Sequence, residues 1–279
     1  MAKREVRYYF GRLNVIAQRT DKIGVLTDGV QPRAIVSHRG LNWGFFQLGT
    51  AQSEVGDFVH GFLVKFRPRT AEEVAIPATH EIDDQMIENR IRAKARFFLH
   101  LSSHIIAYRP FGREISRAVF ASRFKELFEA NLGNFFVEAE IFPIDEERQM
   151  DEAIRGLQKI SRIRVHLHPS NPSNREVWKR VDQRLRRLEV ASYKEDYEAE
   201  PGSSGLAISE DSEINSKIAM AEDGYGSVYV VGEAGGERKT VSTRDAPIIS
   251  LAPYDDQPPE VVLERLAGTL RKILERFTE

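Results

Sequence analysis

The chain of 279 residues contains no cysteine, and this absence excludes several kinds of site at once. Without thiols the protein has no disulfides, no thiolate zinc sites, no iron–sulfur clusters and no cysteine nucleophiles. Long apolar runs are also missing, because no stretch approaches the ~20 residues that cross a bilayer. The first residues, Met1 to Glu5, lack the apolar segment of a signal peptide. These absences predict a cytoplasmic protein that does not insert into a membrane.

An excess of either charge is missing too, since the formal net charge is −2, but the charges are unevenly distributed. Residues 88–125 hold nine basic and two acidic residues, and residues 159–187 hold the same numbers. Residues 189–223 reverse the sign, with ten acidic and two basic residues. A net charge near zero therefore conceals two basic segments, and it is the local field that attracts a polyanion.

What the chain does contain is typical of a globular protein, with 41% hydrophobic and 29% charged residues. Aromatic and β-branched runs make the first hundred residues β-rich. Pro68 and Pro77 interrupt this pattern, so we expect residues 70–74 to form a connection. Apolar residues 97–101 and 105–108 flank a Ser-Ser pair and predict a hairpin.

The middle of the chain alternates strand and helix patterns. A strand over 135–142, a helix over 146–157 and a strand over 159–168 predict a split βαβ, ferredoxin-like unit. A hairpin at Gly235-Gly236 and an amphipathic terminal helix follow.

The predicted fold class is therefore α+β. Its parts are a β-rich N-terminal domain over 1–112, an α+β domain over 113–253 and a C-terminal helix over 254–279.

Both basic segments alternate cations with apolar residues, so a strand would place the cations on one face. In residues 88–101 a helix over 84–95 is the alternative, and it would scatter the cations. The helix expected near residue 180 presents arginines at a spacing of four. Rigid cation arrays suit a regular polyanion, so we expect contacts with nucleic-acid phosphates. The expected contact residues are Arg92, Lys94, Arg96, Arg162, Arg164, His166, His168, Arg180 and Arg184. The alternative is that these are solvated faces, balanced by the acidic stretch that follows.

No complete catalytic motif or cofactor-binding motif is present, and no catalytic residue or cofactor is predicted. His166 and His168 could supply two metal ligands, but the sequence names no third, so no metal site is predicted. Asp223 with Glu237 and Lys239 has the skeleton of a magnesium-dependent nuclease site. Glycine-rich phosphate loops and nucleophile elbows are absent.

The element order around one hairpin resembles a known family. Phe97-Phe98-Leu99-His100-Leu101 and Ile105-Ile106-Ala107-Tyr108-Arg109 lead through Pro110-Phe111-Gly112 into a helix. A strand, a helix, a basic strand, a glycine-bearing hairpin and a last amphipathic helix follow. This order resembles the DNA-binding sensors of the lambda-phage Rex exclusion system and, more distantly, the DNA-binding component of the Kiwa defence system.

The resemblance implies a homodimer that grips double-stranded DNA in anti-phage defence, with an effector protein as a further partner. A second segment, from Ala221-Glu222-Asp223-Gly224-Tyr225-Gly226 to Ser242-Thr243, is similar to a family of uncharacterised bacterial proteins.

The resulting hypothesis is a non-enzymatic, largely sequence-independent duplex-DNA-binding protein that acts as a defence sensor. Two alternatives stay open. One is a metal-dependent nuclease or phosphoesterase that uses the Asp223 skeleton together with the two histidines. The other is a protein-interaction subunit, antitoxin-like or a scaffold, whose basic and acidic segments meet a partner chain.

Overall fold

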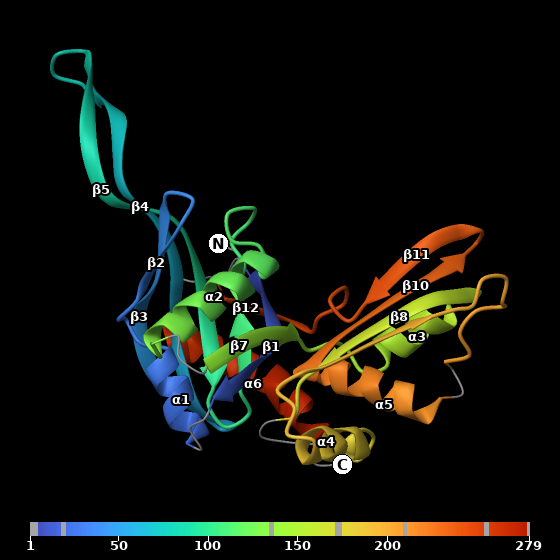
Figure 1. Cartoon of the computed structure of the whole chain (residues 1–279). Helices are drawn as coiled ribbons and strands as arrows, with labels where there is room; N and C mark the ends of the chain where they lie inside the picture. The colour runs from blue at the N-terminus through green and yellow to red at the C-terminus, as the bar shows by residue number, and fades with distance from the viewer. Residues whose placement is uncertain are drawn as a thin grey trace.

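The computed structural model describes residues 5–17, 21–133, 137–170, 175–208, 211–253 and 257–277. The fold is mixed α+β, as predicted, with a β-rich N-terminal part and a C-terminal helix. Two separate antiparallel sheets organise it, and they lie side by side in Figure 1.

The first sheet has eight strands in the order β12-β1-β6-β5-β4-β3-β2, with β7 pairing alongside β1. Its members are β1 (Glu5–Ala17), β2 (Ile35–His38), β3 (Leu41–Ser53), β4 (Gly56–Ile76), β5 (Glu81–His100), β6 (Ile105–Tyr108), β7 (Val137–Pro143) and β12 (Ile249–Pro253). The predicted hairpin over 97–108 is confirmed, because Phe97 pairs with Tyr108.

Helices cover both faces of this sheet. On one face lie α1 (Lys22–Gly29) and α2 (Arg117–Asn131), and on the other lies α6 (Pro259–Glu275). The Oγ of Ser116 caps α2 by accepting a hydrogen bond from the Val119 amide at 3.3 Å. The α2 residues Phe120 and Phe124 are fully buried, and the Phe120 ring stacks on Tyr108 at 4.2 Å between centroids.

Strands β4 and β5 extend beyond the sheet as a two-stranded arm, which we define as residues 67–90 (Figure 1). The expected connection over 70–74 is therefore wrong, because these residues continue β4. Pro68 is tolerated because β4 has no neighbour on its outer side there: β3 pairs only as far as Phe66. A register shift between Lys65 and Phe66 lies at the point where the arm leaves the sheet.

The second sheet has the order β11-β10-β8-β9, and the helices among the described residues pack on one of its faces. The strands are β8 (Lys159–Leu167), β9 (Tyr193–Glu198), β10 (Gly226–Ala234) and β11 (Glu237–Ser242). The helices are α3 (Gln149–Arg155), α4 (Lys179–Arg187) and α5 (Ser212–Met220), which continues into the π-turn η1 (Ala221–Tyr225). The predicted alternation in β8 is confirmed, because Ile163, Val165 and Leu167 are buried beneath the helices.

The predicted domain boundaries do not match the sheets. β7 and β12 pair with β1 in the first sheet, although both were assigned to the 113–253 domain. β7 and β8 lie in different sheets, so the expected split βαβ unit does not form. Residues 135 and 136 of the predicted strand and 254–256 of the predicted helical segment lie outside the described ranges.

Across the part of the chain that the structure describes, no helix combines the length and the apolar character needed to cross a bilayer.

Candidate phosphate-binding cleft

The three β5 cations of the expected interface have different environments. Arg92 and Lys94 are exposed, and the Lys94 ammonium lies over the Phe62 ring at 4.7 Å. Arg96 is only 3% exposed, and its Nη1 donates to the Gln257 carbonyl at 2.8 Å. The expectation that Arg96 contacts phosphates is wrong, because its side chain is buried and binds the Gln257 carbonyl just before α6.

The β8 arginines already have an anionic partner within the chain. Arg162 Nε donates to Asp196 Oδ1 at 2.7 Å, and Arg164 Nε donates to Asp196 Oδ2 at 3.1 Å. Hydrogen bonds from Arg162 and then Arg164 lower the pKa of Asp196 to about 2. The acidic stretch therefore pairs with the basic strand as β9, which reduces the positive field of that face.

The predicted cations on α4 are divided in the same way. Arg184 pairs with Glu213 of α5 at 3.1 Å. Arg180 is exposed and makes no ion pair within the described residues. Of the two histidines, His168 is 6% exposed, so it is not available to a duplex at the surface.

A cavity of about 590 Å³ lies between α2, β7 and the turn after β11. Cations from two elements line it: Arg117 and Lys125 from α2, and the exposed Arg244 from the turn. Lys125 also lies 3.6 Å from Glu129. Glu140 of β7 is the one carboxylate that lines this cleft. The cleft therefore carries a net positive charge.

Uncharged groups of the cleft also suit an anion. Ser116, Arg117 and Ala118 form the N-terminal end of α2, where backbone N–H groups and the helix dipole favour negative charge. Burial raises the pKa of Tyr108 to about 12, so its phenol stays a neutral hydrogen-bond donor. The Arg117 guanidinium lies over Tyr9 at 5.2 Å, and its Nη1 donates to the Arg244 carbonyl at 3.3 Å. These contacts position Arg117 at the cleft.

Glu140 extends the cleft towards both histidines. Its carboxylate and the His166 and His168 rings place their ligand atoms within 4.8 Å of one another. Although burial opposes it, the neighbouring His168 and His166 lower the pKa of Glu140. Burial, and then His168, lower the pKa of His166, with Lys194 and Arg244 acting in the same direction. These three side chains are the described group that could hold a metal ion.

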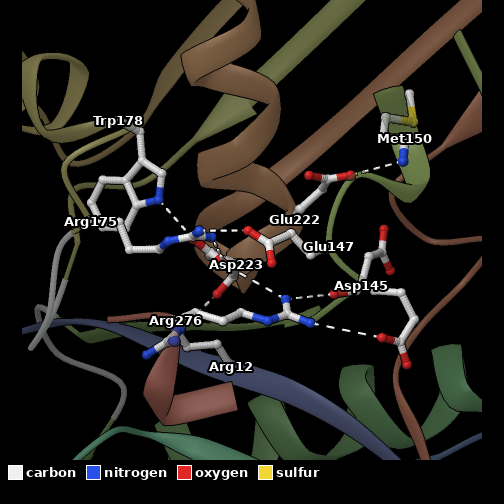
Figure 2. A network of polar contacts seen from close by, with 10 residues as sticks. Arg12, Asp145, Glu147, Met150, Arg175, Trp178, Glu222, Asp223 and Arg276 are labelled. Carbon is white, nitrogen blue, oxygen red and sulfur yellow. Dashed lines mark hydrogen bonds and ion pairs between the residues drawn. The ribbon is translucent and has the colours of Figure 1, made fainter. Parts of the chain in front are cut away.

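Asp223 belongs to a different, buried network that joins the two sheets. Figure 2 shows Trp178 and Arg175 pointing at its carboxylate, and Trp178 Nε1 donates to Oδ2 at 2.7 Å. Arg12 of β1 donates from Nε to the Asp223 carbonyl at 2.9 Å. Glu237 follows the far end of β10, a strand of nine residues, which is about 30 Å away. The Asp223–Glu237–Lys239 skeleton, which the alternative nuclease hypothesis requires, therefore does not assemble into one site.

The same network contains two carboxyl groups whose pKa values burial raises. Burial, and then the charges of Glu222 and Asp245, raise the pKa of Asp145 to about 8. Burial raises the pKa of Glu222 to about 7, with a further contribution from Asp223, although the Met150 amide hydrogen bond opposes it. Asp145 is 1% exposed, and its Oδ1 accepts no hydrogen bond within the described residues.

The cleft residues were not identified from the sequence, although two of them carry a signal that could have been used. Arg117 follows the recognisable N-cap Ser116, and Lys125 lies two turns further along the same helix. These two could have been placed together from helical periodicity. Arg244 and Glu140 carry no such signal, because only tertiary packing brings their turn and strand to α2.

Comparison with known families gives a match that covers most of the chain. The family described as a domain of unknown function (DUF4747) matches residues 64–267. A comparison with curated proteins gave no match.

Proposed function

We propose that this chain, which belongs to the DUF4747 family, binds the phosphodiester backbone of nucleic acid, with the cleft beside α2 as its principal phosphate site. The observation that carries the proposal is the meeting of Arg117, Lys125 and Arg244 with the N-terminus of α2. The arginines expected from the sequence to bind, by contrast, include Arg162 and Arg164, which share Asp196 as an ion-pair partner.

Two features of the cleft and one of the wider surface favour a polymer backbone. Arg244, Ala118 and Ser122 are exposed at its rim, so a ligand that continues beyond the cleft can enter it. Backbone amides and arginines recognise phosphate without reading bases. Arg92, Lys94 and Arg180 lie exposed elsewhere and can add weaker, screened attraction. Binding to double-stranded DNA with little sequence preference is therefore the form of the proposal that we test first.

The first test is fluorescence anisotropy with a labelled random duplex of about 30 base pairs over a salt series. Neutralising three phosphates gives a slope of log affinity against log salt of about −0.9 for each phosphate, or about −2.7 in total. A slope near this value supports the three-cation cleft. No binding at low salt would refute the proposal and favour a protein-interaction role, and a slope of about −6 would mean that other basic residues contribute equally.

A second copy of the chain is the proposed partner of the arm. The distal part, residues 70–89, holds six acidic residues and no lysine or arginine. At its base, Arg67, Arg69, Arg92 and Lys94 make no ion pair within the described ranges. An isolated two-stranded ribbon is marginally stable and exposes unpaired edges. Antiparallel pairing of two arms places each acidic tip against the partner's basic base, which satisfies two-fold symmetry.

Reversing the tip charges tests this dimer by sedimentation analysis. We expect Asp83→Arg with Asp84→Arg to raise the dimer dissociation constant at least about 10-fold, because like charges then meet at both ends. A chain that also carries Arg67→Asp and Arg69→Asp restores complementarity and dimerises again. Glu233→Arg with Glu237→Arg, on the second sheet, is the control that leaves the dimer intact. A monomeric wild-type chain contradicts the arm dimer, and so does a variant with all four substitutions that stays monomeric.

A role as a sensor in anti-phage defence, a cytoplasmic location and an effector partner are also parts of this proposal. Their support is the sequence resemblance in element order and the absence of cysteine. Loss of phage protection in cells that carry a binding-deficient cleft variant is the corresponding test.

A further inference from the structure

We propose that Glu140, His166 and His168 bind a divalent transition-metal ion at the end of the cleft. The central observation concerns His168, whose exposed fraction is only 6%. Its Nδ1 lies 3.0 Å from the Ala191 carbonyl, which can only accept a hydrogen bond, so Nδ1 carries the proton. In the neutral ring Nε2 then presents a lone pair, and none of the described residues makes a hydrogen bond to this buried atom. A histidine oriented by a carbonyl through one nitrogen is the usual form of a metal ligand.

The atom that Nε2 faces is a second ligand rather than a donor. Glu140 Oε2 lies 3.5 Å from His168 Nε2, and ionised carboxylate oxygens only accept hydrogen bonds. Two ligands of a tetrahedral metal with bonds of about 2.1 Å lie about 3.4 Å apart. A metal ion bound between Glu140 Oε2 and His168 Nε2 therefore explains why two hydrogen-bond acceptors face each other.

His166 supplies the third ligand from the same strand. Its ring centroid lies 4.8 Å from that of His168, and all three ligand atoms lie within 4.8 Å of one another. The fully buried Phe142 ring has its centroid 5.8 Å from the His166 centroid and 5.5 Å from the His168 centroid. This packing limits the rotation of both imidazole rings. His166 is half-buried, so a small side-chain rotation can close its distance to the metal.

The donor set indicates the class of metal. Two imidazoles and one carboxylate suit Zn²⁺, Fe²⁺ or Mn²⁺, whereas Mg²⁺ and Ca²⁺ prefer oxygen ligands. Three protein ligands leave a coordination position for water, as in catalytic zinc sites. Glu140 also lines the cleft, so this position lies next to the proposed phosphate site.

The chemistry that follows rests on the proposed function, because it takes the cleft's phosphodiester as substrate. Metal-bound water has a pKa of about 7 and supplies hydroxide. The hydroxide oxygen forms a bond to phosphorus, the P–O bond to the leaving oxygen breaks, and that oxygen takes a proton from solvent. One water is consumed and no redox partner is needed.

Zinc titration of metal-stripped protein by calorimetry tests the site without nucleic acid. We expect one equivalent per chain, and at least a 10-fold weaker affinity in both Glu140→Gln and His166→Ala. His80→Ala, which removes an exposed histidine in the turn of the arm, is the matched control and should bind zinc as the wild type does. Circular dichroism checks that each variant is folded. Zinc should raise the melting temperature of the wild type and of His80→Ala more than that of Glu140→Gln or His166→Ala.

The outcomes separate the site from the proposed function. No zinc binding, or equal binding by all variants, would overturn the site and leave a Glu140–His168 ion pair in its place. Zinc binding with no duplex binding supports the site and refutes the nucleic-acid proposal. If the zinc- or manganese-loaded protein binds duplex or RNA but does not cleave either, the metal site holds and the hydrolytic step is wrong.

Discussion

Reversing two cleft charges, Arg117→Glu with Arg244→Glu, is expected to weaken duplex binding about 100-fold at moderate salt. Each charged hydrogen bond to phosphate contributes about 1.5 kcal/mol, and two lost contacts give about 3 kcal/mol. A loss of 1.4 kcal/mol is tenfold in affinity. The slope of log affinity against log salt should also become shallower by about 2, because two fewer phosphates are neutralised. Anisotropy across the salt series measures both quantities.

The matched control reverses Arg162 and Arg164 to glutamate, the pair on the second sheet. Asp196 accepts hydrogen bonds from both arginines, so we expect their loss to change duplex affinity less than about 3-fold at moderate salt. If this control abolishes binding and the cleft variant does not, the original basic strand is the DNA surface and the cleft assignment is wrong. Because Arg117 also lies over the Tyr9 ring, replacing it removes that contact as well. Lys125→Glu leaves the Arg117–Tyr9 contact in place and is therefore measured alongside the Arg117→Glu, Arg244→Glu variant.

Asp145→Asn is expected to stabilise the protein by an amount that grows between about pH 4 and pH 8. Burial raises the pKa of Asp145 from its ordinary value of 3.8 to about 8. The folded chain therefore keeps a proton that the unfolded chain has already released. Stability from this group is complete below the unfolded pKa and is lost as pH rises through the folded pKa. The limiting slope is 1.36 kcal/mol per pH unit, so over the roughly four pH units between the two pKa values the total is about 6 kcal/mol. Urea unfolding of both proteins at each pH measures it.

A control of opposite sign distinguishes this effect from a general response to pH. The pKa of Asp196 is lowered to about 2 by hydrogen bonds from Arg162 and Arg164. Its contribution is present above the unfolded pKa and disappears as pH falls towards about 2. Asp196→Asn should therefore destabilise the protein at neutral pH and converge with the wild type in acid. A difference between Asp145→Asn and the wild type that stays constant from pH 4 to pH 8 contradicts the buried neutral carboxyl.

The buried network gives Asp223 a structural role in place of the nuclease role that its spacing from Glu237 and Lys239 left open. Gly224 adopts a φ of 83°, and its backbone lies against Arg12. The carboxylate of Asp223 then serves Trp178 and Arg175 (Figure 2). Burial at the junction of two sheets turns it into a structural anion.

The periodicity of apolar residues was sufficient to identify several of the local elements. Alternation identified β8, the cap Ser116 identified the start of α2, and Gly235-Gly236 identified the β10–β11 hairpin. The order of strand and helix patterns was sufficient for the mixed α+β class, and composition indicated a globular core. These features depend on residues close in the chain, for which local conformation and one-sided burial are decisive.

Only the tertiary structure decided which strands share a sheet and which charges stay free. Strands β7 and β12 pair with β1 from distant parts of the chain, and no local pattern encodes such a partner. Asp196 meets Arg162 through β8–β9 pairing, and Glu140 meets His168 at the junction of the two sheets. Free charge and metal ligation depend on distances in space, because Coulomb attraction and coordination bonds act over a few ångströms, whatever the separation in sequence.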